Sequence, residues 1–418
     1  MPPFKKLQGP YGIPIYFQQL GDPVKSVSMS WTVFVGGADD ESVGAPGLYH
    51  WFEHVPFRGT KNYPGGYKEI KGLCTRNGGS MNAWTDPLCT TYHATVPTRI
   101  WKETLAVITD LLANPLIKDD AVAAEREIIV QEITQRRSTP GGLLWHEHLL
   151  NLLYPGHPCG HHVLGTPESL ASMSAQTLRD AHAKNYDRSR CVFFASGNIE
   201  EADLLKELAV VAKEIPARGL PKSHVVRNYG PVPEWKPGRT EIQTEFDASL
   251  VTFLLPLPQK LDLQTWLDLG VLGSLVSYGG LDSPLFRILR DERKLVYHAD
   301  LMEFIFPGGG FYGLGAETNS KNIDAVLQAF KDVFNDPVLY SEERIRTIQT
   351  GIRGGIEIKP INPANFRSSG LQRLKEIGHV YSDEELLAHL DSITPARVRE
   401  ILAHIDIEKA RVIVLRGK

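Results

Sequence analysis

The sequence predicts an α+β protein whose two halves are similar α/β domains related by internal duplication. Residues 173–179 resemble residues 393–399 at an offset of 220 positions. The strand-like residues 251–255 likewise match residues 30–34 at an offset of about 221. A chain of 418 residues is too long for one ordinary core, so two domains of roughly 200 residues each are expected.

The first half of the chain alternates between strand-like and helix-like segments. Apolar and polar residues alternate in the stretches expected to form strands, which are residues 16–20, 24–35, 80–86 and 90–96. Amphipathic stretches are expected to form helices at residues 47–54, 68–77, 99–116 and 119–137. The first of these helices should end at or near His54, because Pro56 would break a helix that ran further.

The domain boundaries follow from composition. Residues 216–237 hold five prolines and two glycines, which is typical of a linker. We therefore expect an N-terminal domain at residues 1–216, a linker at 217–237 and a homologous C-terminal domain at 238–418.

Charge and cysteine content narrow the class of protein. Lys plus Arg number 45 and Asp plus Glu 49, so the net charge of −4 gives no reason to expect nucleic acid or an acidic membrane as a partner. No apolar run is long enough to span a membrane. The four cysteines lie far apart without a Cys-x-x-Cys spacing, which favours a reduced, cytoplasmic chain.

His50 and His54 are the first candidate metal ligands. They stand four residues apart, so they share one face of the expected helix, and zinc is the usual ion for two such imidazoles. Glu53 lies at the edge of that face, where a carboxylate can take a proton from water activated by the metal. The order His-x-x-Glu-His is the inverse of the commoner His-Glu-x-x-His. By itself, such a pair more often belongs to a core than to a metal site.

A catalytic zinc site needs one more protein ligand, and the helix expected at residues 119–137 can supply it. Glu132 is the candidate ligand, and Glu125, two turns earlier on the same face, is the candidate supporting residue of the catalytic group. Carboxylates on a helix are more often only a solvated face, so this assignment depends on further signals.

Several separated motifs supply such signals, because they resemble the pitrilysin/insulinase family of zinc metallopeptidases, which includes the mitochondrial processing peptidases. Residues 53–60 resemble the family's Glu-His-x-x-Phe-Lys-Gly-Thr, and residues 78–85 resemble Gly-Gly-x-x-Asn-Ala-x-Thr. Residues 157–166 resemble its His-Pro stretch that ends in Leu-Gly-Thr. The resemblance runs over nearly the whole chain. It implies that each domain is an α/β sandwich with helices packed on one face of a mixed sheet.

The resemblance also implies roles for individual residues. His50, His54 and Glu132 would hold zinc, and Glu53 would act as the general base. The strand at Asn82 and Ala83 would pair with an extended peptide. Residues 290–297 resemble a C-terminal segment of the family in which an Arg and a Tyr approach the substrate. Here these residues are Arg290 and Tyr297, which would stabilise the oxyanion. Lys294 stands where the family has glycine. Read without the resemblance, Arg290 is more simply a helix-end ion-pair residue and Tyr297 a core aromatic.

The repeat indicates that only the first domain carries the metal motif. Position 271, which corresponds to His50 at the offset of 221, is valine, and no histidine or glutamate stands nearby.

The predicted function is zinc-dependent hydrolysis of short or unfolded peptides, in a chamber completed by a homodimer. One alternative is a non-catalytic or partner-dependent subunit of a heteromeric processing peptidase. Another is a structural zinc site, which would normally have four protein ligands and favour cysteine.

Overall fold

The computed structural model describes residues 4–219, 227, 229–258, 261–358 and 361–418. Residues 220–226 and 228 of the predicted linker 217–237 lie outside the described residues. The chain forms two compact units. The first comprises Met1–Gln135, Tyr154–Tyr229 and Ile361–Val380, and the second comprises Arg136–Leu153, Gly230–Pro360 and Tyr381–Lys418.

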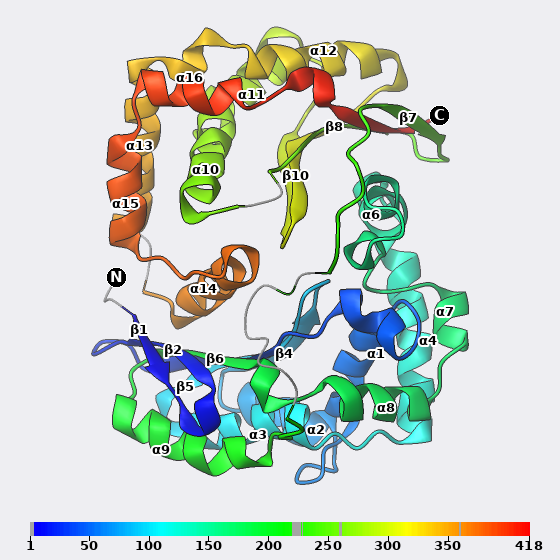
Figure 1. Ribbon diagram of the computed structural model, residues 1–418, viewed down its shortest axis with the longest axis vertical. Coiled ribbons are helices and arrows are strands. Elements are labelled where there is room, and N and C mark those ends of the chain that lie inside the picture. The colour runs from blue at the N-terminus through cyan, green and yellow to red at the C-terminus, as the bar shows by residue number, and fades with distance from the viewer. Residues whose placement is uncertain (1–3, 220–226, 228, 259–260, 359–360) are drawn as a thin grey trace. The chain divides into compact units, whose positions relative to one another are not determined.

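The first unit is built on a six-stranded mixed sheet in the order β1-β2-β6-β3-β5-β4 (Figure 1). β2 and β6 are parallel, and the other neighbours are antiparallel. The strands are β1 Lys5–Gln8, β2 Pro14–Gln19, β3 Ser26–Val33, β4 Ser80–Thr85, β5 Thr90–Pro97 and β6 Cys191–Gly197. The helices are α1 Leu48–His54, α2 Tyr67–Thr75, α3 Trp101–Ala113, α4 Asp119–Arg136, α7 Pro167–Ala171, α8 Ala175–Asn185, α9 Glu201–Val211 and α14 Pro363–Ile377.

The main core of the first unit lies between one face of this sheet and helices from the first half of the chain. Trp31 of β3 and Tyr92 of β5 are fully buried there, next to Leu105 and Ile108 of α3. These strand residues alternate with the polar Ser30 and His93, so each strand turns one apolar face to the core, as a period of two requires.

Helix α14 covers part of the opposite face, although it comes from the second half of the sequence. It packs on β3 and β6, and its Phe366, Leu371 and Leu374 join a second apolar cluster with Tyr16 and Phe194 of the sheet. The predicted boundaries would place α14 in the C-terminal domain, whereas its contacts place it in the first unit. The apolar face of α14 explains it, because this face is buried on the first unit's sheet.

The second unit has a five-stranded sheet in the order β7-β11-β8-β10-β9. Its β7 and β11 are parallel, as β2 and β6 are in the first unit, and the remaining neighbours are antiparallel. The strands are β7 Gly238–Gln243, β8 Ser249–Pro256, β9 Ala299–Phe306, β10 Gly309–Thr318 and β11 Arg411–Arg416. The helices are α5 Pro140–Leu143, α6 Leu149–Leu153, α10 Leu263–Ser277, α11 Pro284–Phe286, α12 Ile323–Phe334, α13 Glu342–Ile358, α15 Asp383–Ser392 and α16 Pro395–Ala403.

The two sheets share strand order and direction, which confirms the predicted α+β class and the internal duplication. Helix α10 occupies the place in the sequence repeat that α1 occupies in the first half, and its Val271 is buried in the second unit's core. Apolar packing therefore replaces the histidine at this position of the second unit.

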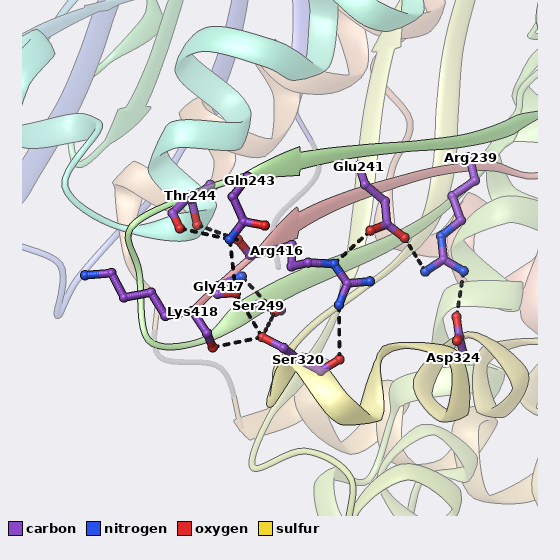
Figure 2. Close-up of polar contacts among 10 residues, drawn as sticks. All are labelled: Arg239, Glu241, Gln243, Thr244, Ser249, Ser320, Asp324, Arg416, Gly417 and Lys418. Carbon is purple, nitrogen blue, oxygen red and sulfur yellow. Dashed lines mark hydrogen bonds and ion pairs between the residues drawn. The ribbon is translucent and has the colours of Figure 1, made fainter.

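The C-terminal strand is fixed into the second sheet by polar contacts (Figure 2). Glu241 of β7 forms ion pairs with Arg239 and with Arg416 of β11. The backbone N–H of Gly417 donates to the buried Ser249 Oγ at 2.9 Å. The ion pairs are half-exposed and contribute little individually, so the backbone ladder and the Ser249 contact carry most of this anchoring.

Candidate metal centre

Helix α1 carries His50, Glu53 and His54, and the buried Asp40 holds its N-terminus. Asp40 Oδ2 accepts a hydrogen bond from the Gly47 N–H at 2.7 Å, and Oδ1 accepts one from the Tyr49 N–H at 2.9 Å. These bonds satisfy N–H groups that have no partner inside a short helix. The α-helix ends at His54, as Pro56 predicts, and a 3-10 turn follows.

His50, His54 and Glu132 converge as the sequence predicts. Glu132 Oε2 lies 3.7 Å from His50 Nε2 and 3.8 Å from His54 Nε2. All three ligand atoms lie within 4.8 Å of one another, and no other group of this kind is found among the described residues. Both distances exceed those of hydrogen bonds.

The spacing of these atoms fits a zinc ion. Zinc binds histidine and carboxylate ligands at about 2.0–2.1 Å, so a tetrahedral site separates its ligand atoms by about 3.3 Å. The two Glu132–histidine separations are slightly wider, and all three atoms lie within 4.8 Å of one another, so an inward movement of the side chains would bring them to a zinc ion. A zinc ion held by these three side chains would keep one position free for water, as catalytic rather than structural zinc sites do.

Glu125, the candidate supporting residue, contacts His54 on the side away from Glu132. This fully buried carboxylate lies 3.0 Å from His54 Nδ1 and accepts hydrogen bonds from Arg58 and, at 3.3 Å, from the Tyr67 hydroxyl. Burial acts to raise the pKa of Glu125, but the hydrogen bonds from His54 and Arg58 outweigh it and hold the pKa below its usual value. Glu125 is therefore ionised at neutral pH.

An ionised Glu125 fixes the tautomer of His54. A carboxylate can only accept hydrogen bonds, so His54 Nδ1 carries the proton, and Nε2, which points to Glu132, is the nitrogen left to bind a metal. This is the state in which an imidazole binds a metal, and it is the usual outcome of a carboxylate behind a metal-binding histidine.

Glu53 is buried beside the candidate metal ligands, and this burial perturbs its carboxyl group. The Thr85 hydroxyl, at the end of β4, donates to Glu53 Oε2 at 2.9 Å. Burial raises the pKa of Glu53 to about 7, against the opposing influences of His54 and the Thr85 hydrogen bond. A carboxyl group with a pKa near neutrality can both accept and return a proton.

Asn82 and Ala83 lie on β4, which is an edge strand of the first sheet. Among the described residues, β4 pairs only with β5, so its other edge is open to a further strand. The Asn82 side chain is exposed and accepts a hydrogen bond from Lys71 Nζ at 3.3 Å, whereas Ala83 is buried.

Arg290 and Tyr297 lie together in the second unit. Arg290 Cζ stands 4.9 Å from the centroid of the Tyr297 ring, and Arg290 Nη1 donates to the Tyr297 carbonyl oxygen at 3.4 Å. The Tyr297 side chain is 82% exposed, so the simpler interpretation as a core aromatic is wrong. Lys294 adopts the left-handed conformation, with φ of +53°, at the position where glycine was expected.

Sequence reasoning gave no role to several residues of the site. Arg58 and Thr85 stand inside the motifs at 53–60 and 78–85, so a signal for them was present. Tyr67 and Lys71 lie on α2, where the sequence pattern shows only an amphipathic helix. Asp40 lies too many residues before α1 to be recognised as a capping residue.

Family models match most of the chain. The model described as insulinase (peptidase family M16) matches residues 19–167, and the one described as the peptidase M16 inactive domain matches residues 172–345. No helix among the described residues has both the length and the apolar composition to cross a membrane.

Relatives and solved structures agree with these matches. An uncharacterized zinc protease of Streptomyces coelicolor is 25% identical over 87% of this chain and 79% of its own length. A probable mitochondrial-processing peptidase subunit beta of Schizosaccharomyces pombe is 30% identical, over 42% of this chain and 38% of its own. The structure of a protease from Helicobacter pylori has a TM-score of 0.87 at 15% identity and full coverage of both chains. Pitrilysin has a TM-score of 0.76 at 19% identity, covering all of this chain and 45% of its own. The chain therefore belongs to the insulinase family of peptidases, family M16.

Proposed function

We propose that the protein is a zinc-dependent endopeptidase that hydrolyses extended peptides. The observation that carries this proposal is the convergence of His50, His54 and Glu132 beside a buried Glu53. The names of the related zinc proteases support zinc as the ion. A zinc ion held by these three side chains would polarise a peptide carbonyl and water at its open position.

The protein's own residues would carry the proton and position the substrate. Thr85 occupies Glu53 Oε2, so Glu53 would take the proton of the attacking water on Oε1 and return it to the leaving amine. The open edge of β4 at Asn82 and Ala83 would hold the peptide by main-chain pairing. Arg290 and Tyr297 would stabilise the oxyanion.

We further propose that the protein acts as a homodimer in the cytoplasm on short or unfolded peptides. One chain carries both the metal residues and the Arg290–Tyr297 pair, so identical subunits could complete a working site. The four cysteines are buried and unpaired, which suits a reducing compartment. Light scattering on the purified protein would give the mass of the assembly and test the dimer.

A second candidate function is that of a subunit active only with a different partner chain. The relative named as a mitochondrial-processing peptidase subunit favours it. Hydrolysis of a quenched fluorescent peptide library, with zinc content measured in parallel, separates the two. Cleavage by the protein alone, lost with a chelator and regained with zinc, supports the peptidase. Bound zinc without cleavage favours the partner-dependent subunit, and absence of any metal contradicts the site assignment.

A further inference from the structure

The face of the first sheet opposite the main core is polar near β4. Asn82, His93 and Ser30 lie directly opposite one another on β4, β5 and β3, so their side chains form one row on this face. In the neighbouring row, Thr95 donates to Ser28 Oγ at 2.9 Å. Helix α14 covers the face beside these rows with apolar side chains.

Arg367 of α14 reaches into this polar region and is buried there without a carboxylate. Its side chain is only 7% exposed, and its Nε donates to Ser28 Oγ at 3.0 Å. Among the described residues, Arg367 takes part in no ion pair. Burial lowers the pKa of Arg367 to about 10, so the guanidinium still carries its charge at neutral pH. Buried charges in proteins are normally paired, so this one calls for a ligand.

Arg344 shows what a buried arginine with a structural role looks like in the same chain. It is 6% exposed, and its guanidinium donates to three carbonyl oxygens at the C-terminal end of α10, those of Ser274, Leu275 and Tyr278. These bonds use three of the five N–H donors of the guanidinium. Arg367, by comparison, has one hydroxyl partner, which leaves most of its donors for a further group.

Other polar groups lie in the same part of the first unit. The charges of Arg367 and Lys71 both act on His93 and, together with the larger effect of burial, lower its pKa to about 4, so His93 is a neutral hydrogen-bonding group at pH 7. Ser30 Oγ is fully buried and has no hydrogen-bond partner within the described structure. Lys71 forms no ion pair with any described residue, and its Nζ donates to Asn82.

We propose that Arg367 and Lys71, with the neighbouring His93, bind a carboxylate group of a peptide. The assignment of a peptide rests on the proposed function, whereas the preference for an anion rests on two cations, Arg367 and Lys71, that form no ion pair with a described residue. A peptide strand added to the open edge of β4 would turn alternate side chains to the polar face, beside Asn82. The carboxylate could come from an Asp or Glu side chain or from the C-terminus of the peptide, because the two groups have the same chemistry.

The test is a binding experiment that does not depend on cleavage. The full chain carrying Glu53→Gln, loaded with zinc, is titrated against fluorescein-labelled decapeptides and followed by fluorescence anisotropy. One probe has an Asn and an amidated C-terminus, a second has an Asp and an amidated C-terminus, and a third has the Asn and a free C-terminus. At least one carboxylate probe should bind about tenfold more tightly than the neutral probe, because a charged hydrogen bond replaces a neutral one. The better probe identifies the source.

Variants of the site assign this preference to its residues. Arg367→Gln should reduce the preference to about twofold or less, Arg367→Lys should restore part of it, and added salt should weaken it. Lys68→Gln is the matched control, because Lys68 is an exposed lysine on α2, one turn before Lys71, and it should keep the preference. If Arg367→Gln does not fold, Lys71→Gln, whose side chain is only partly buried, makes the same test and should also reduce the preference.

Equal affinity for all three probes, or a full preference in the Arg367 or Lys71 variant, would overturn the inference. Hydrolysis by the unaltered chain is measured separately. Preferential binding of the carboxylate probes without any hydrolysis would support the anion site and contradict the proposed peptidase activity. Hydrolysis without preferential binding would support the peptidase activity and contradict the anion site.

Discussion

Replacing Glu125 by glutamine tests whether the carboxylate in contact with His54 sets the metal affinity of the site. The carboxylate of Glu125 accepts hydrogen bonds on two sides, from His54 Nδ1 at 3.0 Å on one oxygen and from the Arg58 Nε–H and the Tyr67 hydroxyl on the other. A glutamine carbonyl can accept from only one of them, and its NH2 group then faces the other. If the NH2 group faces His54, the imidazole must move its proton to Nε2, and Nε2 then has no lone pair for a metal.

The size of the effect follows from this competition. The carbonyl should stay with the charged Arg58, because hydrogen bonds to charged groups are the stronger ones. His54 then spends most of its time in the wrong tautomer. Loss of such a supporting carboxylate typically lowers metal affinity about 10- to 100-fold, or roughly 1.4–2.8 kcal/mol. Global stability should change less, since the Arg58 side chain is 31% exposed and water can replace its partner.

The assay is a competition titration of zinc against a chelating dye. Glu127→Gln is the matched control, because Glu127 lies on the same helix but is exposed, and its zinc affinity should equal that of the unaltered chain. A Glu125→Gln protein that is folded and binds zinc within about twofold of the control would refute the argument from the His54 tautomer.

Three further predictions concern stability. Asp40→Ala should lower the free energy of unfolding by about 2 kcal/mol, since it leaves the Gly47 and Tyr49 N–H groups at the start of α1 without an acceptor, and unchanged denaturant unfolding would contradict this. Lys294→Gly should stabilise the protein by up to about 1 kcal/mol by relieving the left-handed conformation, and a loss of stability in the same assay would show that the lysine side chain matters more. Burial lowers the pKa of His389 below its usual 6.5 despite the opposing charge of Asp268. The neutral His389 side chain therefore contributes to stability above pH 6.5, and this contribution is lost as the pH falls through the lowered pKa. His389→Gln should therefore lose less thermal stability than the unaltered chain between pH 7.5 and about pH 5, and an equal loss in both proteins would count against it.

The sequence contained enough information for the fold class and for the positions of the candidate metal ligands. The alternation of strands and the repeat at about 220 residues are local or self-similar signals, and both sheets confirm the duplication. His50 and His54 share a helix face by spacing alone, and the family motifs point to Glu132 and Glu125, which the structure brings beside them.

The remaining features depend on tertiary contacts that no local pattern carries. The packing of α14 on the first sheet joins residues about 170 positions or more apart, such as Phe366 and Phe194, and so cannot be read from periodicity. The same holds for Thr85 with Glu53 and for Arg367 with Ser28. The conformation of Lys294 could not be predicted for another reason. A lysine rarely adopts the left-handed conformation that Lys294 has here.

The most direct test of the proposed peptidase is a comparison of the unaltered chain with Glu53→Gln. Zinc content and hydrolysis of a quenched fluorescent peptide are measured on the same preparations. If Glu53 moves the proton, the variant should bind zinc as the unaltered chain does and cut at least about 100-fold more slowly. A variant that retains its zinc and cuts at the rate of the unaltered chain would contradict the role of Glu53 and, with it, the mechanism proposed for this site.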